Sequence, residues 1–158
     1  MTVFAAAFAT DLIDDAPDIS SASSIAPWNN IGATTSPAES LIGPRIVWHK
    51  VFTPAPGAVV VTQTPPLASI PTGVLDAGDT YLHVVQGPAD GSELTDATLG
   101  LNVAVYSNDV GGGSLKGIVT IPTAPGGVWF YIGSRSFRGG DIANQWVQVT
   151  LPRPPGTA

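Results

Sequence analysis

The stretch that decides the fold reads VWHKVFTPAPGAVVVT and runs from Val47 to Thr62. Aromatic and β-branched residues fill both of its ends, and such residues favour β-strands. Between them, prolines and a glycine rule out a continuous helix and supply the backbone angles of a tight turn. The stretch predicts a β-hairpin with strands over 45–52 and 58–64. We expect Trp48 to anchor the core and His49 to point away from it, because neighbours on a strand face opposite sides.

The rest of the chain repeats this pattern of short strands separated by turn signals. A second hairpin is expected where strands 115–123 and 128–134 flank the turn Ala124-Pro125-Gly126-Gly127. With about eight strands and no helical pattern between them, the fold class is all-β. We expect a single antiparallel β-sandwich over residues 19–151, with jelly-roll or Greek-key connections. The other predicted strands are residues 19–25, 80–86, 101–107 and 145–151.

Both ends of the chain lie outside the predicted sandwich. Residues 1–18 form a lead-in with at most a short helical turn, in which Phe4 and Phe8 pack onto the sandwich. Residues 152–158 are proline-rich and predict a stiff tail that cannot extend a sheet. The apolar amino terminus lacks a basic region and passes at once into acidic residues, so we expect no signal peptide. No apolar run reaches the roughly 18 residues of a membrane span, so no membrane partner is expected.

The composition argues against several classes of function. A chain of 158 residues, 44% of them hydrophobic, is predicted to form one domain whose core needs no cross-links. Its net charge of −6, with Lys and Arg together numbering 6, argues against binding nucleic acid, which depends on clustered basic residues. The absence of cysteine removes disulfides, zinc thiolate sites and thiol catalysis. Because only 11% of residues are charged, hydroxyl and amide side chains must cover much of the surface.

The candidate metal ligands are two histidines and an acidic turn. His49 and His83 each lie within a predicted strand, and alternation places both toward solvent or a sheet edge. No third ligand lies at a suitable spacing from them. Aspartates at positions 11, 14, 15 and 18 could offer oxygen ligands to calcium, but the glycine and the closing glutamate of an EF-hand loop are missing. We interpret the acidic turn as solvated, and we expect neither a metal nor a cofactor.

No arrangement of residues in the sequence predicts catalysis. A Gly-x-Ser-x-Gly elbow is absent, since Gly133-Ser134-Arg135-Ser136 lacks the second glycine. Gly111-Gly112-Gly113-Ser114 precedes a strand, so no helix N-terminus follows it to hold a phosphate. Every Asp and Glu lies in a predicted loop or turn, whereas a glycosidase needs two carboxylates fixed on facing strands. The chain is therefore predicted not to be an enzyme and to have no catalytic residues.

Three loops are the candidate interaction surfaces: residues 26–44, 87–100 and 135–144. Long surface loops are often functional or held by a partner, and arginine and aromatic residues are enriched at interface hot spots. Trp28 is either a lid on the edge of the core or an exposed contact residue. Phe137 either covers the end of the core or takes part in recognition. The candidate interface residues are Trp28, Asn29, Asn30, Arg135, Phe137, Arg138 and Arg153.

Several motifs follow one another in an order known from one domain family. They are GATTSPAE (32–39), VWHKVFTPAPGAV (47–59), DTYLHVV (79–85), the Asn108-Asp109 turn, VTIPTAPGGVWFYI (119–132) and WVQVTL (146–151). Together they resemble the bacterial pre-peptidase C-terminal domain, a jelly-roll-like β-sandwich that accompanies secreted enzymes. The resemblance covers about residues 8–151. It implies the fold and no catalytic residue, because the family has none.

The setting of this chain differs from the usual one of that family. The family's domain normally stands behind a signal peptide and a protease, and neither is expected here. Similar domains also occur in minor tail proteins of phages that infect actinobacteria. A lysine-poor, cysteine-free composition rich in Ala, Gly and Pro resembles that second setting.

Two functions are therefore expected. The first is a non-enzymatic phage virion protein, either a minor tail component or a capsid decoration protein, made in the host cytoplasm and located in the virion. It would bind neighbouring capsid or tail subunits, in several copies or as a homo-oligomer. The alternative is a free-standing accessory module of a secreted or cell-surface system that binds a protein or a carbohydrate, such as a host surface glycan. Nucleic acid and membrane are not expected partners of either.

Overall fold

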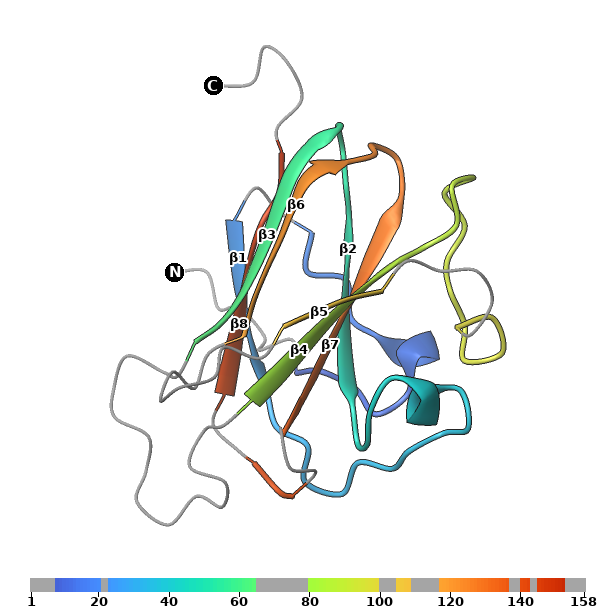
Figure 1. Cartoon of the computed structure of the whole chain (residues 1–158), viewed down its shortest axis with the longest axis vertical. Coiled ribbons are helices and arrows are strands. Elements are labelled where there is room, and N and C mark those ends of the chain that lie inside the picture. Colours follow the sequence, from blue (N-terminus) through green and yellow to red (C-terminus); the bar gives the residue numbers. More distant parts are fainter. Residues whose placement is uncertain are drawn as a thin grey trace, which may run out of the picture.

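Two four-stranded antiparallel sheets form the framework of the protein (Figure 1). The computed structural model describes residues 8–20, 23–64, 80–99, 105–108, 117–136, 140–142 and 145–152. Sheet I has the strand order β1-β8-β3-β6, and sheet II has the order β2-β7-β4-β5. The strands are β1 (Ser23–Trp28), β2 (Val47–Phe52), β3 (Gly57–Thr64), β4 (Thr80–Gln86), β5 (Val105–Asn108), β6 (Ile118–Ala124), β7 (Trp129–Ser136) and β8 (Gln145–Thr150).

The strand pairing is that of a jelly roll. The chain folds back on itself so that β1 pairs with β8, β2 with β7, β3 with β6 and β4 with β5, all antiparallel. Two further pairings, β3 with β8 and β4 with β7, join these ribbons into the two sheets. The predicted all-β class and antiparallel sandwich with jelly-roll connections are confirmed.

Both predicted hairpins are wrong, and the reason lies in the turns. β2 and β3 belong to opposite sheets, as do β6 and β7, so each proline-glycine turn is a corner between sheets. The two corners bond to each other: the Thr53 amide donates to the Val128 carbonyl at 2.9 Å, and the Gly127 amide donates to the Thr53 carbonyl at 2.8 Å. The Thr53 hydroxyl also donates to the Pro125 carbonyl. Proline and glycine mark a change of direction but do not decide which strands pair.

The main core fills the space between the sheets. Residues that alternate along each strand face inward and are almost completely buried, as period two requires. Sheet I contributes Ala26, Trp28, Val59, Val61, Val119, Ile121, Val147 and Val149, and sheet II contributes Val47, Val51, Leu82, Val84, Phe130 and Ile132.

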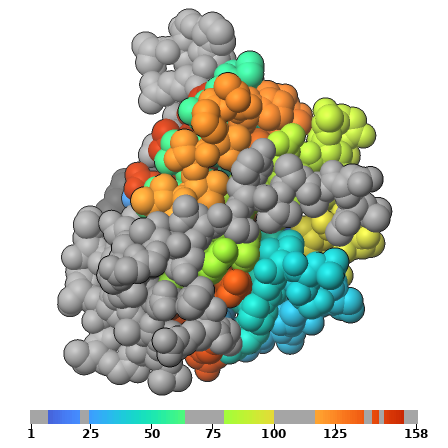
Figure 2. All heavy atoms as spheres, in the orientation of Figure 1, coloured from blue at the N-terminus to red at the C-terminus, as the bar shows by residue number. Residues whose placement is uncertain are grey.

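A second apolar cluster covers the outer face of sheet II. Trp48, Val85 and Tyr131 point outward from the sheet and are buried by Ile13, Ala16, Ile46, Leu94 and Leu99. The covering segments include two 3-10 turns, η1 (Ile13–Asp15) and η2 (Glu39–Leu41). Ser36 donates a hydrogen bond to Asp96, so the two covering loops lie side by side (cyan and yellow in Figure 2). Sheet II is therefore also covered on its outer face where Trp48, Val85 and Tyr131 lie.

Several details at the ends of the chain differ from expectation. Phe8 was expected to pack onto the sandwich, but it is 52% exposed, and Ile13 occupies the apolar cluster instead. The predicted edge strand at 19–25 lies later, at Ser23–Trp28. Phe4 and residues 153–158 lie outside the described part of the chain. No helix among the described residues is long and apolar enough to span a membrane.

Candidate functional site

Three of the seven candidate interface residues are buried, and their predicted contact role is wrong. Trp28 lies in the main core with 1% of its surface exposed, which fits a lid on the core and not an exposed contact. Asn30 and Arg135 are also buried, while Asn29 is half-buried. Phe137, Arg138 and Arg153 lie outside the described residues.

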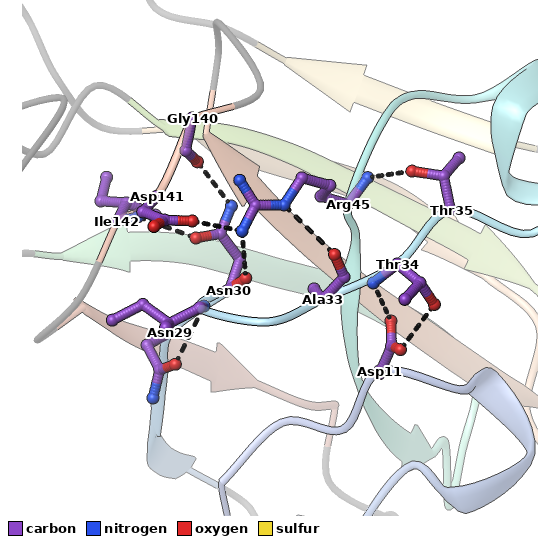
Figure 3. A network of polar contacts seen from close by, with 11 residues as sticks. Asp11, Asn29, Asn30, Ala33, Thr34, Thr35, Arg45, Gly140, Asp141 and Ile142 are labelled. Carbon is purple, nitrogen blue, oxygen red and sulfur yellow. Dashed lines mark hydrogen bonds and ion pairs between the residues drawn. The ribbon is translucent and has the colours of Figure 1, made fainter.

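Asn30 and Arg45 hold two of the predicted interaction loops together (Figure 3). The Asn30 amide nitrogen donates to the Gly140 carbonyl at 2.9 Å, and its oxygen accepts from the Ile142 amide at 2.7 Å. Arg45 donates to the Asn30 carbonyl at 2.9 Å and forms an ion pair with Asp141. Its φ of 53° places it in the left-handed region, where a non-glycine residue is uncommon. These groups stabilise the molecule and do not form a free surface.

The acidic turn makes local contacts of the same kind. Asp11 accepts hydrogen bonds from the amide and the hydroxyl of Thr34, which ties the amino-terminal segment to the loop before β2 (Figure 3). Asp14 accepts from the Asp96 amide at 2.6 Å. Within the described residues, no group of three or more His, Asp and Glu side chains is arranged to hold a metal ion.

Both histidines are buried, contrary to the prediction that they face solvent or an edge. His49 lies on the inward face of β2 with Val47 and Val51, so it belongs to the interior between the sheets. His83 lies on the outer face of sheet II, where strand alternation alone predicts exposure to solvent. That face is covered by loops, so alternation does not separate buried from exposed positions there.

His83 is part of a stacked group with Tyr81 and Arg135. The Arg135 guanidinium lies 4.5 Å over the Tyr81 ring, and its Nε donates to His83 Nε2 at 2.9 Å. The rings of Tyr81 and His83 are stacked with centroids 4.8 Å apart. Burial, and secondarily the charge of Arg135, lower the pKa of His83 to about 3. His83 is therefore neutral near pH 7 and accepts a hydrogen bond from a permanent cation.

Glu39, which the sequence predicts to lie in a surface loop, is a buried carboxyl. Only 1% of its surface is exposed, and Trp48 Nε1 donates to its Oε1 at 3.3 Å. Its Oε2 has no hydrogen-bond partner within the described part of the chain. Burial, with smaller contributions from the charges of Asp11 and Asp96, raises the pKa of Glu39 to about 7, against the lowering effect of its hydrogen bonds. Glu39 can therefore take up or release a proton near neutral pH.

A sequence signal for the position of Glu39 exists. Ser36-Pro37-Ala38-Glu39 has the Ser-x-x-Glu spacing of a capping box, which marks the start of a helical turn. In the structure the Glu39 amide donates to the Ser36 hydroxyl at 3.1 Å at the start of η2. The signal predicts the turn, although it does not predict that the carboxylate is buried against Trp48.

A half-buried aromatic pair lies near the corner of sheet II. The rings of Phe52 and Trp129 meet edge to face, with centroids 5.1 Å apart and an interplanar angle of 65°. Lys50 Nζ lies 4.8 Å over the Trp129 ring and pairs with Glu93. This group combines apolar and charged atoms at the surface, but its two rings do not form a flat platform.

The outer face of sheet I carries no charged side chain among the residues that the structure describes there. Alternation and register place Ile25, Gln148, Thr62 and Ile118 in one row across the four strands. A neighbouring row contains Thr150, Val60 and Thr120. Ile25 and Ile118, at the two edges, are 59% and 40% exposed. The charged residues that the structure describes all lie elsewhere: Asp11, Asp14, Asp15, Asp18, Glu39, Arg45, Lys50, Asp90, Glu93, Asp96, Arg135 and Asp141.

The outer face of sheet I is therefore the best candidate for a functional surface, and it is one that the sequence analysis did not identify. The expected likeness to the pre-peptidase C-terminal domain stays a prediction. Comparisons with protein-family models, with curated proteins and with solved structures gave no match to this chain.

Proposed function

We propose that this chain is a non-enzymatic structural protein of a phage virion that binds neighbouring virion subunits through the outer face of sheet I. The observation that carries the proposal is that the described residues of that face include no charged side chain, with exposed Ile25 and Ile118 at its edges. The cores of protein interfaces are depleted in charged residues, because a buried charge without a partner is costly. The face can be covered by another protein without that penalty.

The jelly-roll topology supports the proposal by analogy of fold. Eight-stranded jelly rolls are found in viral capsid proteins and in lectins. Fold alone does not assign function, so this analogy raises the expectation only for these two classes. The sequence-based expectation of a minor tail or capsid decoration protein belongs to the first class.

A lectin-like function is the second candidate, and the aromatic pair of Phe52 and Trp129 favours it. Aromatic rings can stack on the apolar faces of sugar rings, and Lys50 and Glu93 beside the pair offer hydrogen-bonding groups. The edge-to-face arrangement presents one ring rather than a platform. Binding on a glycan array that Trp129→Ala abolishes would support this candidate, and an array without signal would contradict it.

The virion proposal is tested by measuring how much of the chain enters purified virions. Mass spectrometry should detect the wild-type chain in virions from the phage that encodes it, and Ile25→Lys should lower its amount at least tenfold. The matched control is Leu41→Lys, because Leu41 is exposed on η2, over the opposite sheet. Absence of the wild-type chain from virions would overturn the proposal, as would equal losses for the two variants.

A further inference from the structure

We infer that the outer face of sheet I binds a second copy of this chain in a two-fold symmetric dimer, with β1 of each copy lying over β6 of the other. The inference rests on the proposed function in that it uses the same face, and it names a second copy as the neighbouring subunit. Three features of the face lead to it: the symmetry of its residues, the lack of charge among those that the structure describes, and its proline-bearing edges. The area of the face then limits how strong the dimer can be.

The central row of the face reads nearly the same from either end. From β1 to β6 it runs Ile25, Gln148, Thr62 and Ile118, with cross-strand partners Ile25 with Gln148, Thr62 with Gln148, and Thr62 with Ile118. Apolar side chains therefore occupy both edges, and an amide and a hydroxyl occupy the centre.

A two-fold axis parallel to the strands and midway between two facing sheets brings complementary groups together. It places β1 over β6 and β8 over β3, so Ile25 of each copy faces Ile118 of the other. At the centre, Gln148 faces Thr62, and these side chains both donate and accept hydrogen bonds. Such contacts are isologous, as in most homodimers, and the face-to-face packing is the one that joins sheets in sandwiches.

The distribution of the described charges is compatible with a second copy at this face. Each chain carries a net charge of −6, so copies repel one another at long range. The described acidic residues lie on the loops and on the side of sheet II, as the charged residues named above show. Pairing through the outer face of sheet I keeps those groups apart, and none of the described charges is buried without a partner by it.

The edges of sheet I disfavour the alternative of edge-to-edge pairing. β1 and β6 are the edge strands, and they contain Pro27 and Pro122 respectively. Proline has no amide hydrogen to donate to an added strand, and it is a common means of blocking sheet edges. Association through this sheet is therefore directed to its face, where it closes into a dimer.

The area of the face sets the strength of the dimer. Strands about 4.8 Å apart, each with about six residues rising about 3.4 Å, give the four-stranded sheet I an outer face of about 400 Å². Two copies then bury about 800 Å², which is below the roughly 1,200–2,000 Å² of a stable interface and in the range of weak, transient ones. We expect a weak dimer in solution that is strengthened where many copies are held in one assembly.

Sedimentation velocity on the full chain over concentrations from about 10 μM to about 1 mM tests the dimer. The wild-type chain should change from monomer to dimer within that range. Ile25→Lys and Thr120→Lys should each raise the dissociation constant at least tenfold, because each buries a lysine without a partner. Leu41→Lys should leave it unchanged, and far-UV circular dichroism establishes that each variant is folded.

A mixing experiment tests the two-fold register itself. Ile25→Lys chains and Ile118→Glu chains should each be monomeric alone, but should form a mixed dimer together, since position 25 of one faces position 118 of the other. A wild-type chain that stays monomeric throughout, or charge-changed chains that do not pair, would overturn the inference. A monomeric chain that still enters virions overturns the dimer alone, whereas a dimer absent from virions overturns the proposed function alone.

Discussion

Replacing Glu39 by Gln should stabilise the protein above neutral pH and have little effect in acid. In the unfolded chain this carboxyl ionises with its ordinary pKa of 4.5, and in the folded chain burial raises the pKa to about 7. The folded state therefore binds more protons between these values, and the free energy of unfolding falls as pH rises from about 4.5 to about 7. At about 1.4 kcal/mol per pKa unit, the full penalty above pH 7 is about 3 kcal/mol. Glu39→Gln removes the charge and keeps an oxygen that can accept from Trp48.

The assay is urea unfolding followed by tryptophan fluorescence at about pH 5 and about pH 8, between which this linkage predicts the difference. At the higher pH the variant should be more stable than the wild type by about 1–3 kcal/mol, and near pH 5 by much less. The quantity compared is variant minus wild type, because His83 contributes in the opposite direction. Its folded pKa lies below its ordinary 6.5, at about 3, so its stabilising contribution is lost as pH falls through that range.

Glu93→Gln is the control, because Glu93 is an exposed glutamate whose ion pair with Lys50 should contribute at most about 1 kcal/mol. Its substitution should not reproduce the rise in stability above neutral pH. If Glu39→Gln raised the free energy of unfolding by the same amount at both pH values, proton binding by Glu39 would not be linked to folding. A variant less stable than the wild type at pH 8 would refute the argument altogether.

Three further substitutions test the packing and polar contacts. Gly133→Ala should destabilise the protein by about 1–3 kcal/mol in urea unfolding, because a Cβ there would lie 2.9 Å from the Trp48 ring; a loss below about 0.5 kcal/mol would contradict this packing. Asn30→Ala should cost about 1–3 kcal/mol by the same measurement, since it leaves the buried Ile142 amide and the part-buried Gly140 carbonyl of the facing loop unsatisfied. Arg135→Gln should raise the pKa of His83 from about 3 toward its ordinary value without reaching it, because burial is the larger cause. An NMR titration of the imidazole measures this, and an unchanged pKa would contradict a role for the arginine charge.

Period-two alternation is informative in sheet I because one face of that sheet is open. Val59 and Val61, like Val147 and Val149, alternate with residues that reach the surface, so period two separates inside from outside. Sheet II is covered over much of both faces, and in β2 and β4 most residues on both sides are buried. Alternation then indicates only whether a side chain points between the two sheets or toward the covering loops. It does not indicate whether that side chain is buried, so it does not predict the burial of His49 and His83.

The turn signals located the bends of the chain but not its pairing partners. Pro54, Pro56 and Gly57 mark a change of direction that suits a hairpin as well as a corner between sheets. The choice is made by contacts between segments far apart in sequence, such as Thr53 with Val128. The same holds for Glu39: a capping box predicts its turn, but its burial depends on Trp48 and on the loop that carries Asp96.

The proposed functional face has no continuous sequence motif, because its rows of side chains cross the strands and take one residue from each. Its central row takes residues 25, 148, 62 and 118, one from each strand, and the row exists only once the register is known. The sequence nevertheless contains a coarse sign of it, since every Asp and Glu lies in a predicted loop or turn. This placement argues against paired catalytic carboxylates, and it equally implies sheet faces without acidic charge. Such a face, in an acidic chain, is a place where another protein surface can pack without leaving a buried charge unpaired.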